Sequence, residues 1–66
     1  MSTALPRLIT AHQLAQVLGE SLVTVRRHTR RGEYDAFAIN VGTDRTPRWR
    51  YDTARLNRWL DARRAA

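Results

Sequence analysis

The sequence predicts a small, mainly α-helical domain that includes one β-hairpin. Two helical patterns lie between residues 11 and 32, and only a short turn around Gly19 separates them. After Gly32 the apolar residues change from helical spacing to the alternation of a half-buried strand. A third helical pattern closes the chain, so the predicted order is helix, tight turn, helix, two-stranded hairpin and helix.

Length and composition limit the class of protein. The 66 residues suffice for one small domain, and a chain of this size buries only about 60% of its unfolded surface. There is no cysteine, and the N-terminus lacks an apolar run that could serve as a signal peptide or membrane span. We therefore expect a cytoplasmic protein with no disulfide, no thiolate metal site and no membrane partner.

The charge points to an anionic partner. The formal net charge is +6, from 12 basic and 6 acidic residues, and every basic residue is arginine. Such a field favours nucleic acid, or less often an anionic membrane surface. A basic protein that needs no such partner is the alternative, but the arginines are clustered rather than spread evenly.

The first helix is predicted by its end signals. We expect residues 1–7 to form a flexible N-terminal segment and residues 8–64 to form the domain, with Leu8 and Ile9 packing on its core. A capping box places the helix start just after Thr10, and Gly19 ends the helix after about eight residues. The residues expected on its inner face are Leu14, Val17 and Leu18, with Ala11 and Ala15 as small neighbours.

The second helix spans Ser21–Gly32 and carries four arginines. Ser21 is a good N-cap residue and Gly32 a good C-cap residue. At about 100° per residue, one face is mildly apolar and the other is cationic. The inward residues are Leu22, Val25 and Thr29, with His28 at the edge. The outward residues are Val23, Arg27, Arg30 and Arg31, with Thr24 and Arg26 on the flanks.

The C-terminal half predicts a hairpin followed by a helix. Two alternating segments flank the turn-rich segment Gly42–Pro47. The residues expected on the core face are Phe37, Ile39, Trp49 and Tyr51, whereas Arg48 and Arg50 share the other face. Asp52 or Thr53 can cap the final helix. Its apolar stripe comprises Leu56, Trp59 and Leu60, and its outer side carries Arg55, Arg58, Arg63 and Arg64.

Three residues favour a helix-turn-helix arrangement for the first two helices. Two closely crossing helices need a small residue at the crossing, a turn residue that tolerates positive φ and an apolar anchor on the second helix. Ala15, Gly19 and Val25 supply these at spacings of four and six. With the hairpin as a wing, the predicted fold is a winged helix-turn-helix. Glu20, His28 and Thr29 are polar for their positions, so we expect a less firmly held second helix.

Arginine on such a helix suits duplex DNA. The major groove admits a helix, and arginine can grip guanine O6 and N7 or clamp a phosphate. We expect base contacts from Arg27 with Val23 and Thr24, and backbone contacts further along the helix. The predicted DNA-binding residues are Val23, Thr24, Arg26, Arg27, Arg30, Arg31, Arg45, Arg48 and Arg50, the last three on the wing. The alternatives are a solvated charged face and a hairpin that only covers the core.

Catalysis finds little support in the sequence. His12 and His28 have no carboxylate or cysteine at metal-ligand spacing, and the six acidic residues are scattered. There is no glycine-rich phosphate loop and no nucleophile motif. We therefore expect a protein that is not an enzyme and needs neither a metal nor a cofactor.

The motifs resemble those of one family. Several short motifs are similar to those of the excisionase-type winged helix-turn-helix domains related to the MerR family. They are Leu14–Ala15, Leu18–Gly19, Thr24–Arg27 and Arg30–Glu33, followed by Trp49–Tyr51 and Trp59–Leu60. The resemblance covers about residues 8–60. Short members of this family are excisionases, also called recombination directionality factors, of phages and integrative elements.

The resemblance implies a non-catalytic role in DNA recombination. It implies a protein that binds repeated sites beside an attachment site, bends the DNA and promotes integrase-mediated site-specific excision. Its implied partners are double-stranded DNA, an integrase and other copies of itself side by side on DNA, in the nucleoid of a bacterial host cell. One alternative is a small MerR-like transcriptional regulator, a repressor, with no recombination role. Another is a protein-interaction module that presents its basic face to an acidic partner.

Overall fold

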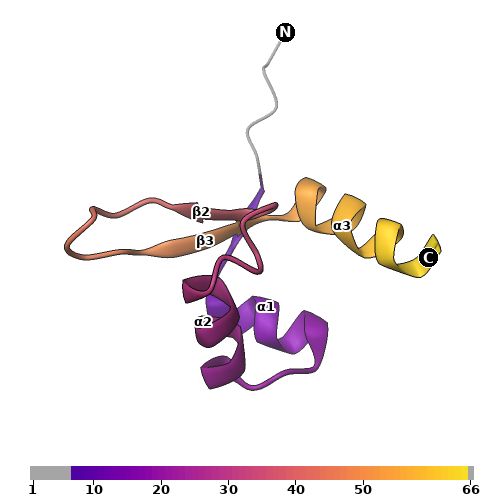
Figure 1. The fold of residues 1–66 in the computed structure, drawn as a ribbon, viewed down its shortest axis with the longest axis horizontal. Helices are drawn as coiled ribbons and strands as arrows, with labels where there is room; N and C mark the ends of the chain where they lie inside the picture. The colour runs from indigo at the N-terminus through magenta and orange to yellow at the C-terminus, as the bar shows by residue number, and fades with distance from the viewer. Residues whose placement is uncertain (1–6, 66) are drawn as a thin grey trace, which may run out of the picture.

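The computed structural model describes residues 7–65, which form three helices and a three-stranded antiparallel sheet (Figure 1). The elements in order are β1 (Leu8–Ile9), α1 (Ala11–Leu18), α2 (Leu22–Arg30), β2 (Ala38–Asn40), β3 (Trp49–Asp52) and α3 (Thr53–Ala65). The flexible segment predicted over residues 1–7 lies outside the described range except for Arg7. In Figure 1 the β2–β3 hairpin and α3 extend in opposite directions, with α1 and α2 together on one side.

The sheet has one strand more than predicted. Its order is β1-β3-β2, and both pairs are antiparallel. Leu8 pairs with Asp52, and Ile9 pairs with Tyr51. The two-stranded hairpin of the prediction was therefore incomplete, because a two-residue strand is too short to show alternation and its partner lies more than forty residues away in the chain.

The hairpin register corrects the predicted core face. Ala38 lies opposite Tyr51, and Ile39 lies opposite Arg50. Directly opposed residues in an antiparallel pair project to the same face. Ile39 therefore does not share the face of Tyr51, as predicted, but the face of Arg50. Phe37 precedes β2 in a turn, and from there its ring reaches the core, 6.2 Å from the Tyr51 ring.

The helix caps agree with the sequence signals. The Gln13 N–H donates to Thr10 Oγ1 at 3.1 Å, the Thr10 N–H donates to Gln13 Oε1 at 2.9 Å, and Gly19 ends α1 with φ +68°. At α2 the Thr24 N–H donates to Ser21 Oγ at 3.1 Å. This helix ends at Arg30, slightly before the predicted Gly32, which has φ +80°.

The final helix is capped from the sheet. Of the two candidates, Asp52 is the capping residue, because its Oδ1 accepts the N–H groups of Ala54 at 2.9 Å and Arg55 at 3.2 Å. Asp52 is also the last residue of β3. One buried carboxylate therefore joins the end of the sheet to the start of α3.

The core lies between the sheet and the helices. Its buried apolar residues are Leu14, Ala15, Val25, Tyr34, Phe37, Tyr51 and Leu56. Trp49, Trp59 and Leu60 pack against this cluster and are half-buried. Val17 was wrongly predicted on the inner face of α1, since its side chain is 60% exposed. Tyr34 was not predicted; it lies in the turns between α2 and β2, a segment without helical or strand periodicity.

The polar residues that raised doubt about α2 all have partners. Thr29 Oγ1 donates to the Val25 carbonyl at 2.8 Å and lies 2.7 Å from Tyr51 Oη. His28 Nδ1 lies 2.7 Å from Glu33 Oε2. The Tyr34 hydroxyl donates to Glu20 Oε1 at 2.7 Å, and burial, with this hydrogen bond, raises the pKa of Tyr34. Hydrogen bonds thus replace part of the expected apolar contact.

The Thr29–Tyr51 contact gives an asymmetric prediction for stability. Thr29→Val leaves the buried Tyr51 hydroxyl without its partner, which should cost about 2 kcal/mol of unfolding free energy. Tyr51→Phe leaves Thr29 bonded to the Val25 carbonyl and should cost about 1 kcal/mol or less. Urea unfolding measures both.

The double variant Thr29→Val/Tyr51→Phe is the matched control. It removes both polar partners, so its unfolding free energy should lie close to that of Tyr51→Phe alone. Additive losses in the double variant would contradict a direct bond between the two side chains.

Candidate nucleic-acid interface

The exposed face of α2 is strongly cationic. Arg26, Arg27 and Arg30 lie on the helix and Arg31 follows it, and all four side chains are exposed. Within residues 7–65, no hydrogen bond or salt bridge engages any of these four guanidinium groups. Val25 and Thr29 hold the opposite side of the helix in the core. The face is therefore built to present free positive charge.

A groove joins α2 to β3. It has a volume of about 510 Å³ and is lined from three places: the start of α1, one side of α2, and residues 47–51 at the base of the hairpin. Its cationic residues are Arg26, Arg30, Arg48 and Arg50. The sequence assigned the first two to a helix and the last two to a wing, and the fold brings them around one space. The groove therefore has a strongly cationic lining.

The apolar part of the groove lining was not predicted. Leu22 and Pro47 contribute apolar surface to its lining. Trp49 was predicted as a core residue; it packs against the core but is half-buried and also lines the groove. The strand alternation does indicate that Trp49 and Tyr51 share a face, but the position of α2 beneath that face is a tertiary feature.

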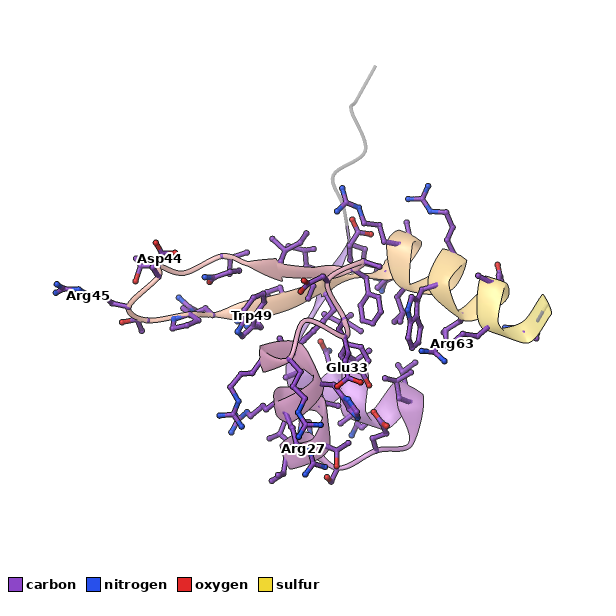
Figure 2. The ribbon with its side chains drawn as sticks, in the orientation of Figure 1. Arg27, Glu33, Asp44, Arg45, Trp49 and Arg63 are labelled. Atoms are coloured by element: carbon purple, nitrogen blue, oxygen red, sulfur yellow. The ribbon has the colours of Figure 1, made fainter. Side chains whose placement is uncertain are left out.

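The side chains of Asn40 and Thr43 hold the hairpin loop, and Thr43 Oγ1 accepts the Thr46 N–H at 2.9 Å. Asn40 Oδ1 accepts the N–H groups of Gly42 at 2.9 Å and Arg48 at 3.0 Å, and Asn40 Nδ2 donates to the Thr43 carbonyl at 3.3 Å. A side chain at Gly42 would collide with the Thr46 carbonyl, which explains the glycine. These bonds hold the two ends of the loop together, and Arg45 projects from its far tip (Figure 2).

Acidic side chains lie at two places beside this surface. Glu33 lies next to the C-terminal end of α2, and its bond to His28, helped by the charges of Arg31 and Arg27, lowers the pKa of Glu33. Asp44 neighbours Arg45 at the loop tip (Figure 2). An ionised Glu33 therefore bounds the cationic face of α2 at one end.

The remaining predicted site residues are placed as follows. Thr24 is partly buried, and its hydroxyl accepts a hydrogen bond from Ser21 at 2.8 Å. Val23 is 70% exposed on α2. Arg50 is half-buried and donates to the Trp49 carbonyl at 2.9 Å, so it is the most fixed of the groove arginines.

Three of the arginines of α3 contact other side chains of the protein. Arg64 pairs with Asp61 at 3.6 Å, and Arg55 lies 3.9 Å from Asp52. Arg63 is exposed, as predicted, and its guanidinium lies over the Trp59 ring, 4.1 Å from the centroid. The Arg63 side chain thereby covers a half-buried aromatic ring, which is a structural role.

Two classes of site are not found in the described part of the chain. No helix in residues 7–65 combines the length and the apolar character needed to cross a membrane. Nor do these residues contain a group of three or more histidine, cysteine or acidic side chains that could hold a metal ion.

Comparison of the chain with family models, with curated proteins and with solved structures gives no match. The interpretation of the surface therefore depends on its own geometry and charge, together with the motifs in the sequence.

The loop bonds predict a local effect of Asn40→Ala. The Gly42 and Arg48 N–H groups would lose their acceptor while the β2–β3 ladder stays in place. We expect these two amides to exchange with solvent about fivefold faster, as the loss of about 1 kcal/mol implies. Hydrogen exchange followed by NMR measures this.

Asn57→Ala on exposed α3 is the matched control and should leave both amides unchanged. Equal exchange in the wild type and in Asn40→Ala would show that the loop is held by something other than Asn40.

Proposed function

We propose that the protein is a winged helix-turn-helix DNA-binding protein, with α2 as the recognition helix and the β2–β3 hairpin as the wing. The path through α1, a left-handed Gly19 and α2 supports this interpretation. Ala15 is 6% exposed and Val25 is fully buried, as a close crossing of the two helices requires. The α1–α2 pair then offers one exposed helical face to a ligand.

The observation that carries the proposal is the shared groove. Four arginines, two from α2, one from β3 and one from the residue just before β3, surround one space, and the four guanidinium groups of residues 26–31 are free of partners within residues 7–65. A solvated charged face would need no such convergence. We assign phosphate contacts to Arg26, Arg30, Arg31, Arg48 and Arg50, with Arg45 reaching the backbone or the minor groove. Base contacts are assigned to Arg27, Val23 and Thr24.

Within this class, we propose an excisionase, or recombination directionality factor. It binds attachment-site DNA as several side-by-side copies, bends it and thereby promotes excision by a partner integrase. The motifs of the sequence support this role. Binding and bending need no catalytic group, no cofactor and no metal, and the protein acts on the chromosome in the bacterial cytoplasm.

The DNA-binding proposal predicts a strong dependence on salt. If about five phosphates are neutralised, log affinity should fall with log salt at a slope of about −4 to −5. Arg27→Ala should lose about 1–3 kcal/mol of discrimination between sequences, because it removes a base contact. Arg48→Ala should weaken all sequences about equally and reduce the salt slope by about 1. Fluorescence anisotropy with labelled duplexes measures these quantities.

Arg64→Ala provides the control, since Arg64 pairs with Asp61 away from the groove. Identical behaviour of the Arg27 and Arg48 variants would overturn the division into base and phosphate contacts. Failure to bind any duplex at low salt would overturn the DNA-binding proposal and favour an acidic protein partner.

The recombination role predicts a separate outcome. With the cognate integrase and its attachment sites, the protein should stimulate excision and oppose integration, and Arg27→Ala should weaken both effects. An in vitro recombination assay measures the products. Duplex binding without any effect on excision would contradict the excisionase role and leave the MerR-like transcriptional regulator.

A further inference from the structure

Val23 is the most exposed large apolar residue in the described chain. Its side chain is 70% exposed, compared with 60% for Val17 and 48% for Val41. The fold gives no reason for valine here, because a β-branched residue is a poorer helix former than alanine and this one buries little surface. A reason outside the fold is an apolar contact with a ligand.

The position of Val23 fits such a contact. It is the second residue of α2, at the end of a recognition helix that approaches base edges. Arg27 lies four residues further, and residues at this spacing are neighbours on one side of a helix. The Arg27 guanidinium has no partner within residues 7–65, whereas the Thr24 hydroxyl is engaged by Ser21. One side of α2 therefore offers an apolar group beside a free bidentate donor.

We propose that Val23 and Arg27 together read a C5-methylated pyrimidine next to a guanine. This inference rests on the proposed binding of duplex DNA. In the major groove guanine offers O6 and N7 as two acceptors, and thymine is the unmodified base that offers a methyl group. Side chains about 5–6 Å apart on the helix suit base pairs that follow each other at about 3.4 Å. Thymine and 5-methylcytosine present the same methyl group, so either can be its source.

The experiment first selects duplexes that the full-length protein binds from a random library. In the selected duplex, the thymine beside the guanine is then replaced by uracil, which removes only the methyl group. Wild-type affinity should fall about fourfold, the effect of one buried methyl-sized group. Val23→Ala should bind the thymine and uracil duplexes equally. If the selected site has cytosine there, the comparison of cytosine with 5-methylcytosine identifies the methylated base as the source.

Val17→Ala is the matched control, because Val17 is a similarly exposed valine on α1. It should keep the wild-type preference for the methyl group, and thermal melting should show that both variants stay folded. Duplex binding without a methyl preference, or an equal preference in the wild type and Val23→Ala, would overturn this inference alone. Absence of any duplex binding would instead overturn the proposed function, and this inference with it.

Discussion

The central strand β3 is the element on which the rest of the structure depends, because β1, β2, α1 and α3 all pack against it. The buried hydrogen bond between Thr29 and Tyr51 joins α2 to this strand, next to the fully buried side chain of Val25. Tyr51 also pairs with Ile9 of β1 and Ala38 of β2, so it touches both neighbours of the central strand. A helix of nine residues is not stable alone in water, so α2 depends on its packing against α1 and on this buried bond to β3.

The folded chain also brings arginines from separate segments together. Arg30 lies in α2 and Arg50 in β3. Together with Arg26 and Arg48 they line one groove. Like charges repel across such a space, and this cost is relieved when an anion enters it. The grouping of these four arginines therefore exists only in the folded chain.

Polar side chains supply many of the contacts between elements that apolar residues supply in a larger core. The 66-residue chain can bury only a small apolar cluster. Glu20 accepts from Tyr34, His28 contacts Glu33, and Asp52 caps α3 from inside the sheet. Each bond needs defined geometry, so together they restrict the orientation of the elements more than apolar contact would.

The sequence by itself determined the three helices and the two hairpin strands, since local signals act between residues a few positions apart. Local signals marked both ends of α1, through the Thr10–Gln13 capping box and Gly19, and the start of α2, through the Ser21 cap. The helical periodicity of α2 placed Val25 inward. Tertiary structure alone decided four other features. These are the third strand, the register that turns Ile39 toward the Arg50 face, the burial of Tyr34 and the grouping of four arginines around one groove. These features depend on contacts between residues far apart in the chain. Composition and periodicity do not report such contacts, because they arise only when the complete core is packed.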